Sequence, residues 1–478
     1  MAVDILSWLR QVDDTPNSLN DINLAKPPTI PPKSRKRQRL ESSISNGNIL
    51  TSKPITDKFK HPTPPPSSSK AAAIMAPAKK RKTAQGAVSP TPNTDEGEQE
   101  KTPRPLRSVH LPSDTSSRSS ASGRSGASSP RKQLAAMALS NYCVGVETRA
   151  MSDPSGLPPS LATMRTKLLQ FGRGRGILGI NGLVGIEDET AARELHPDMV
   201  AIYEDKEFCC SEQRDDLGTT PSPLDVLYVL ECAADCLRMG RSEAAWNHEV
   251  HFPLLCLALR PRLKGAFQQL VKVTSCSAAS IIPDYRIRFA PDKKIDFCVY
   301  IDPHHDPNVT NMASSVDTVR AGLPLLSINP TDDLSLLSNP IAIPIETKRP
   351  GEGLDTANLQ VATFLTAHLT LLQRLVDSGA RVPVQDGEKV PSVDDIGFLP
   401  GLIVQGNTWN FIAASRQDSR IVIWSEISLG STSDIFGIYQ IVASLQLLRQ
   451  WINMTYWPWL RRVTYRAAQA TNVPTAPG

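Results

Sequence analysis

Apolar residues are sparse in the first quarter of the chain and become regularly spaced only beyond it. Spacings of three and four residues then predict two short helices, over 134–139 and 161–171. The same periodicity predicts a longer apolar helix over 223–240 and another over 242–259, which Ser242 can cap. The ordered part of the chain is therefore expected to begin with helices.

Strand-like segments follow in the second half. They lie at 285–289, 294–301 and 341–348, and a polar loop of about 38 residues separates the last two. A helix over 355–376, strands at 401–414 and 420–427, and a final helix over 433–451 complete the pattern. This order predicts an α/β fold, with a mixed central sheet flanked by helices.

Charge divides the chain into two parts. Residues 1–135 hold 22 Lys and Arg against 11 Asp and Glu, a net charge of +11, whereas the remainder holds 30 against 37. The basic part is rich in Pro, Ser and Lys and poor in aromatic residues, so it cannot bury enough apolar area to offset the entropy of ordering. We expect a long disordered N-terminal tail over 1–135 and one domain over 136–470, with its core at about 240–450.

Two basic clusters lie in proline-containing stretches of this tail. They resemble nuclear import signals, which an import receptor reads as point charges, and they predict a location in the nucleus. A solvated charge run, or a nonspecific arm on nucleic acid, is the alternative. The cluster residues are Lys33, Arg35, Lys36, Arg37, Arg39, Lys79, Lys80, Arg81 and Lys82.

Several common classes of protein do not fit the sequence. The start of the chain has an early acid and no basic n-region, unlike a secretory signal, and no apolar run approaches the roughly 20 residues of a membrane helix. The eight cysteines include no CxxC pair, so a zinc site is not expected from their spacing. A GxGxxG match within 172–179 lacks a preceding strand, which favours a turn over a dinucleotide site.

Charged residues stand in two of the apolar strands. Because side chains alternate between the faces of a strand, Glu346 and Lys348 point the same way. The apolar residues at the odd positions of 295–301 share one face, which leaves Asp296 on the other. If the two strands are neighbours, these three charges converge on an apolar sheet, where they cost stability unless they pair or hold a metal. The trio therefore predicts a functional site.

The helix–strands–helix order, with an acid on the second strand and Glu-x-Lys on the third, resembles the PD-(D/E)XK nuclease superfamily. The resemblance is greatest to nuclease-like proteins of filamentous fungi that join a basic tail to such a domain. It implies a restriction-endonuclease-like core in which Asp296 and Glu346 bind Mg²⁺, with Mn²⁺ as an alternative, and Lys348 positions or deprotonates the attacking water. It also implies that Glu243 adds a carboxylate and that Gln360 takes the polar position on the following helix.

These residue types suit hydrolysis of a phosphodiester. The reaction brings hydroxide to an anion and builds further negative charge, and a divalent ion held by one or two carboxylates meets both needs. A nearby ammonium offsets charge and orients water. The resemblance thus implies a nuclease that acts on nucleic acid, with DNA favoured over RNA.

Other residues compete for these roles. Glu249 lies close enough to Glu243 to replace it, and Asp284 follows a proline as a literal Pro-Asp pair. The sequence 304–306, His-His-Asp, resembles a metal cluster, although loop polarity explains it as well. Pro344 removes a ladder donor within the third strand, and such a proline normally marks an edge or a bulge.

Three functions remain open from the sequence. The first is a nuclear, Mg²⁺-dependent nuclease, and the second is a catalytically degenerate nuclease fold that binds nucleic acid or protein in the nucleus. The third is an adaptor that docks a protein through Trp8 and the aromatic residues of 451–459. Since the domain is net acidic, Arg349 and the pair Arg286 and Arg288 are the expected phosphate contacts. The oligomeric state is left open.

Overall fold

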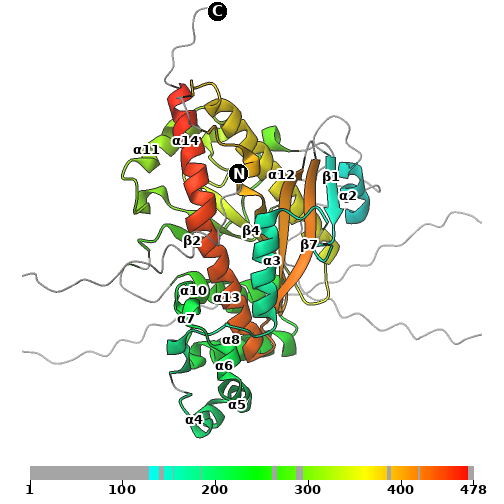
Figure 1. The fold of residues 1–478 in the computed structure, drawn as a ribbon. Helices are drawn as coiled ribbons and strands as arrows, with labels where there is room; N and C mark the ends of the chain where they lie inside the picture. The colour runs from blue at the N-terminus through cyan, green and yellow to red at the C-terminus, as the bar shows by residue number, and fades with distance from the viewer. Residues whose placement is uncertain are drawn as a thin grey trace, which may run out of the picture. The chain divides into compact units, whose positions relative to one another are not determined.

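The computed structural model describes residues 129–138, 145–153, 155–184, 186–260, 265, 267–286, 294–384, 389–417 and 420–471. Residues 1–128 of the expected tail, with both basic clusters and Trp8, lie outside these residues, as does Arg288, whereas a helix begins within the expected tail at Pro130. Within them, one sheet is covered by helices (Figure 1), which confirms the expected α/β class.

Seven strands form a mixed sheet in the order β1-β7-β6-β5-β4-β3-β2. β1 is parallel to β7 and β4 is parallel to β5, whereas all other neighbours are antiparallel. The strands are β1 (Gly145–Arg149), β2 (Val271–Ser275), β3 (Phe297–Ile301), β4 (Ile341–Lys348), β5 (Leu399–Gln405), β6 (Thr408–Gln417) and β7 (Arg420–Ser431). β4 is thus an inner strand with a neighbour on each side.

Helices cover both faces of this sheet. Phe252 stacks on Phe297 of β3, with ring centroids 5.7 Å apart, while Cys298 of the same strand packs with Phe364. Because successive strand residues point to opposite faces, the helices that carry Phe252 and Phe364 lie on opposite sides. Figure 1 shows α3, α13 and α14 in front of the strands.

The α-helices are α2 (Pro130–Ala138), α3 (Pro159–Gly172), α4 (Glu189–Leu195), α5 (Pro197–Glu204), α6 (Lys206–Cys209), α7 (Glu212–Asp215), α8 (Pro223–Arg238), α9 (Glu243–Trp246), α10 (Phe252–Leu259), α11 (Met312–Arg320), α12 (Leu354–Gly379), α13 (Ile435–Trp451) and α14 (Trp457–Thr471). A π turn, Asn247–His251, joins α9 to α10, and another, Ile452–Tyr456, joins α13 to α14. None of the described helices has the length and hydropathy that a membrane crossing requires.

Two of the expected strands are wrong. The segment 401–414 contains a turn at Gly406 and Asn407, so it belongs to two strands, β5 and β6. The strand expected at 285–289 is absent from its described part, because Tyr285 ends a short 3-10 turn and 287–289 lie outside the described residues. The first strand after α10 is instead β2, which the sequence pattern did not indicate.

The segment 303–340 is more structured than the expected polar loop. It contains α11, whose Met312, Val316 and Val319 are buried. This helix packs against α14. The error arose because only three apolar residues in nine anchor α11, too few to give a clear helical period.

The C-terminal aromatic residues belong to the core. Trp451, Tyr456, Trp457 and Trp459 are all buried, and Trp451 stacks on Tyr456 with ring centroids 5.4 Å apart. Side chains buried in this way do not present a docking surface, so the adaptor hypothesis loses this support.

Pro344 lies inside an inner strand and not at an edge, but the expected irregularity is close by: Val299 pairs with Ile343 and Tyr300 with Ile341, so the register of β4 against β3 shifts just before Pro344. Its neighbour Ile345 directs its carbonyl oxygen to the Asp296 N–H on the β3 side, at 3.0 Å, so Pro344 faces β5. The pairing of β4 with β5 begins at Ile345 and Leu402, one residue later. The missing donor therefore falls where the ladder starts, and no ladder bond is interrupted.

Two histidines are fully buried in this core. His251 ends the first π turn, and its Nε2 lies 2.9 Å from the Gly406 carbonyl oxygen. The Nε2 of His368, on α12, lies 3.0 Å from the hydroxyl of Tyr456. Burial lowers the pKa of His251 to about 4 and that of His368 to about 3, so both rings are neutral near pH 7.

We expect the free energy of unfolding to fall as the pH drops from about 6.5 towards 5. In this window the unfolded chain protonates both histidines and the folded chain does not, so the unfolded state binds more protons. Urea titrations at about pH 7, 6 and 5 measure the slope. His251→Gln should reduce it, whereas His248→Gln, at an exposed position of the same turn, should leave it unchanged. Equal slopes in the two variants would contradict the assignment.

Candidate active site at the end of the central strand

The carboxyl end of β4 holds two charged side chains on the same side of the strand. Glu346 is 1% exposed, and the Nζ of Lys348 lies 2.5 Å from its Oε1. The same ammonium donates a hydrogen bond to the carbonyl oxygen of Thr347, at 2.7 Å. Lys348 is thus held close to its own strand.

Asp296 reaches this end of β4 from the bend that precedes β3. Its Oδ2 accepts hydrogen bonds from the backbone N–H and the hydroxyl of Thr347, both at 2.8 Å. The two strands are neighbours, as the sequence analysis expected. One detail differs, because β3 begins only at Phe297, and Ile295 packs with Cys298 on the other face.

The first turn of α9 supplies a third carboxylate. Ser242 caps this helix by accepting a hydrogen bond from Ala245 N, at 3.3 Å, which places Glu243 at the helix start. The Oε2 of Glu243 lies 3.6 Å from the Nζ of Lys348. Its rival Glu249 contacts the Sγ of Cys236 instead, at 3.6 Å.

Gln360 fastens the segment that carries Asp296. It lies on α12, is 9% exposed, and donates from Nε2 to the carbonyl oxygen of Lys294 at 2.9 Å. The structure therefore gathers all five candidate residues around the end of β4, although Gln360 contacts backbone.

Burial dominates the electrostatics of this group. It raises the pKa of Glu346 to about 8, an effect that the charge of Asp296 increases and that of Lys348 opposes. Burial also raises the pKa of Glu243. Burial by itself would lower the pKa of Lys348, but the nearby carboxylates, Glu346 first, outweigh it and raise that pKa. Lys348 is therefore protonated near neutral pH in this arrangement and can donate hydrogen bonds.

Two glycines shape the backbone around Lys348. Gly353 caps α12 with a φ of +69°, and a Cβ at this position would lie 2.8 Å from the Cδ of Lys348. Gly406, with a φ of +55°, donates its N–H to the carbonyl oxygen of Lys348 at 2.8 Å. Since the carbonyl of Gly406 is bonded to the buried His251, the π turn supports the turn that holds the end of β4.

Thr347, Gly353 and His251 also belong to the site, although none of them is among the site residues expected from the sequence pattern. A hydroxyl residue between Glu346 and Lys348, and the Gly-Glu-Gly sequence shortly after, were signals for the first two. The contact of His251 with Gly406 spans 155 residues, and no local pattern indicates it.

The competing residues take part in other contacts. Asp284 is exposed on its 3-10 turn. The Nδ1 of His305 lies 2.9 Å from Asp302, and Asp306 accepts a hydrogen bond from the Nε1 of Trp457 at 2.9 Å. These bonds tie the turn at 303–305 to the fold, which favours loop polarity over a metal cluster.

The expected phosphate contacts are engaged with protein. Arg349 forms an ion pair with Glu352, with 2.5 Å between Nη2 and Oε1. Arg286 donates from Nε to the carbonyl oxygen of Ile281 at 2.7 Å. Neither is directed solely to an incoming ligand.

One carboxylate oxygen at the site suits a cation. The Oε2 of Glu346 is buried and has no hydrogen-bond partner among the described residues. Mg²⁺ commonly binds one or two carboxylates and keeps several waters. Within the described ranges, no group of three or more His, Cys, Asp and Glu is spaced to hold a metal ion. Asp296 and Glu346 thus fit a hydrated ion better than an all-protein cage.

Comparison with models of protein families finds the PD-(D/E)XK nuclease superfamily over residues 194–457. No curated protein and no solved structure matches the chain significantly. The matched range includes β2 to β7 and every candidate residue of the site. Because the match covers more than half of the chain, this protein belongs to the PD-(D/E)XK nuclease superfamily.

Proposed function

We propose that the protein is a nuclease that uses Mg²⁺ or Mn²⁺ to hydrolyse phosphodiester bonds in nucleic acid, with DNA as the preferred substrate. The observation that carries the proposal is the buried Oε2 of Glu346, without a partner among the described residues, beside an ammonium 2.5 Å from the other oxygen. Buried charges of this kind cost stability and occur most often where chemistry requires them.

Each residue has a separate task in this proposal. Asp296 and Glu346 hold the metal ion, which when bound activates water and offsets the charge that builds on the phosphate. Lys348, kept protonated by its neighbours, donates hydrogen bonds that orient a water or a phosphate oxygen. Glu243 balances the ammonium and, being only partly buried, is accessible to a water molecule. Gln360 keeps the segment of Asp296 in place.

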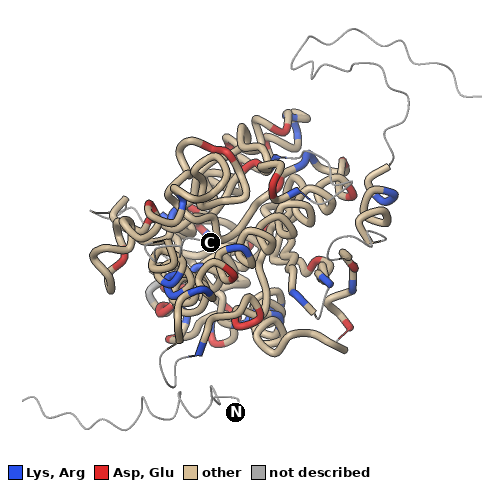
Figure 2. Tube along the Cα trace, turned by 90° about the horizontal axis from the view of Figure 1, so that it is seen from above, with Lys and Arg blue, Asp and Glu red and all other residues tan. Residues whose placement is uncertain are grey.

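The preference for DNA rests on the proposed location. The import-like clusters of the tail support a role in the nucleus, with an import receptor as a partner. Figure 2 shows basic and acidic residues interspersed along the described chain. We infer that the tail, with its net charge of +11, supplies most of the nonspecific attraction to the polyanion.

A nuclease fold that binds without cutting is the second candidate. It is favoured by one observation: the Oδ2 of Asp296 and the Oε1 of Glu346 are both already bonded to protein groups. A metal ion must compete with those bonds or use the remaining oxygens. This candidate would be selected if the protein bound DNA but released no cleavage products with any divalent metal ion.

Lys348→Ala should lower the rate of DNA cleavage in Mg²⁺ by about 10²-fold or more, since it removes a preorganised donor. Plasmid nicking and the degradation of labelled single strands measure the effect. Lys167→Ala, at an exposed position on α3, is the matched control and should cut normally. Thermal unfolding of both variants checks that they fold. Unchanged cleavage in folded Lys348→Ala would falsify the role of this residue.

Glu346→Gln and Asp296→Asn should each weaken Mn²⁺ binding about tenfold or more, since each removes a charged oxygen ligand. Isothermal titration calorimetry gives this affinity without an activity assay. Binding should also be tighter at pH 8 than at pH 6.5, because ligation requires a deprotonated carboxylate and the pKa of Glu346 is about 8. Glu352→Gln, on the nearby loop, is the control. Wild-type affinity in both site variants would show that the metal ion binds at another place.

Replacing Lys79, Lys80, Arg81 and Lys82 with alanine should shift a fluorescent fusion of the full chain from the nucleus to the cytoplasm. The reason is loss of the point charges that an import receptor binds. Fluorescence microscopy measures the ratio of the two compartments. The same replacement at Lys53, Lys58 and Lys60, which form no dense cluster, is the control. The import hypothesis is wrong if the ratio stays the same both when this cluster is replaced and when the cluster at 33–39 is replaced.

A further inference from the structure

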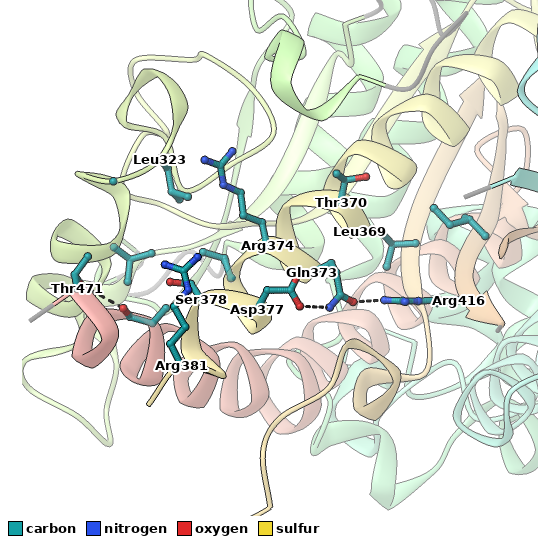
Figure 3. Close-up of a pocket in the computed structure, with 15 residues that line it drawn as sticks. Leu323, Leu369, Thr370, Gln373, Arg374, Asp377, Ser378, Arg381, Arg416 and Thr471 are labelled. Carbon is teal, nitrogen blue, oxygen red and sulfur yellow. Dashed lines mark hydrogen bonds between the residues drawn. The ribbon is translucent and has the colours of Figure 1, made fainter. Parts of the chain in front are cut away.

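A hollow of about 670 Å³ lies between the second half of α12, the ends of α11 and α14, the end of β6 at Arg416 and the start of β7 at Ile421 (Figure 3). It is remote from Lys348. β6 starts beside the end of β5 near the site and runs away from it, so Arg416 lies at the opposite end of the sheet. Along α12, the 14 residues from Gln360 to Arg374 span about 21 Å. The hollow is therefore separate from the candidate active site.

Arginines dominate the charge of this hollow. Arg374, Arg381 and Arg416 line it, and the only acidic lining residue is Asp377. Among the ion pairs between described residues, none includes these three arginines. A concave surface with three guanidinium groups and one carboxylate attracts an anion.

Neighbouring side chains position part of this charge. Arg416 donates a hydrogen bond to the Oε1 of Gln373, whose Nε2 donates to the Oδ1 of Asp377 at 2.7 Å (Figure 3). The amide of Gln373 thus binds the carboxylate of Asp377 and lies between it and Arg416. Arg374 approaches the hydroxyl of Tyr285, and it and Arg381 are exposed. Both are therefore accessible from solvent.

Much of the remaining lining is apolar. Leu323, Leu369 and Ile421 form part of the wall, beside the hydroxyl groups of Thr370 and Ser378. A volume of this size is typical of small-molecule sites and far exceeds the needs of a bare phosphate ion. Guanidinium groups bind phosphate through paired hydrogen bonds, and the apolar wall suits a ring.

We propose that this hollow binds a free nucleoside phosphate, with its phosphates on Arg374 and Arg381 and its base against the apolar wall. The 5′-terminal nucleotide of a nucleic-acid strand has the same chemistry. A pocket of this volume holds one nucleotide but not the strand that follows it, so we take the free nucleoside phosphate as the ligand. The site does not depend on the chemistry proposed for Lys348 and Glu346.

Isothermal titration calorimetry of the full chain with ATP and with AMP tests the proposal. Arg374→Gln/Arg381→Gln should lower the affinity about tenfold or more, the effect of losing one or two charge-assisted hydrogen bonds. Arg193→Gln/Arg238→Gln removes the same charge from exposed positions on α4 and α8 and should bind as wild type. Lys348→Ala should also bind as wild type, which separates this site from the nuclease proposal.

Three results would overturn the proposal. One is equal loss of affinity in the two double variants, which would indicate general electrostatic attraction. Another is displacement of ATP by inorganic phosphate at equal concentration, which would show that the base adds nothing. The third is binding of a 5′-phosphorylated oligonucleotide at the same arginines with no competition from ATP, which would assign the hollow to the nucleic-acid path.

Discussion

Burial of the Glu346 carboxylate is the constraint on which the rest of the site depends. A carboxylate with 1% exposure is costly unless another charge or a metal ion compensates it. Lys348 provides part of that compensation at 2.5 Å, and the raised pKa of Glu346 shows that the compensation is incomplete. The imbalance favours any cation that can reach the remaining oxygen. Protonation of Glu346 relieves this cost below about pH 8, and a cation at the remaining oxygen would relieve it at higher pH.

The backbone around this pair leaves little freedom. The carbonyl oxygen of Lys348 accepts a hydrogen bond from Gly406, and its side chain runs so close to Gly353 that a Cβ there would lie 2.8 Å from the Cδ of Lys348. Gly406 is held in turn by His251, which stacks with Trp246 at 5.7 Å and meets Trp409 edge to face at 5.9 Å. The charged group is therefore supported by a rigid aromatic core. Such support is what a site requires if its side chains are to stay in a productive geometry.

Local patterns in the sequence carried much of the fold and part of the site. Alternation in β4 correctly placed Glu346 and Lys348 on one side, and the apolar period of α12 gave its start to within two residues. Predictions failed where long-range contacts decide the outcome. The turn at Gly406 was missed because it depends on the pairing of β5 with β6. The helix α11 was missed because its apolar side is buried against α14. The arginines of the hollow come from separate parts of the fold, since Arg374 lies on α12, Arg381 follows that helix and Arg416 lies on β6, so no short stretch of sequence contains all three.

The π turn before α10 has an angular consequence. An α-helix turns by about 100° per residue, so one extra residue in a π turn rotates everything before it by that amount relative to everything after it. Phe252, after the turn, faces the sheet and stacks on Phe297, while Glu243, before it, meets Lys348 at the sheet end. In an uninterrupted helix these two directions would be offset by about 100° from those observed. The irregularity at 247–251 therefore acts as a phase shift that lets one helix serve both the core and the site.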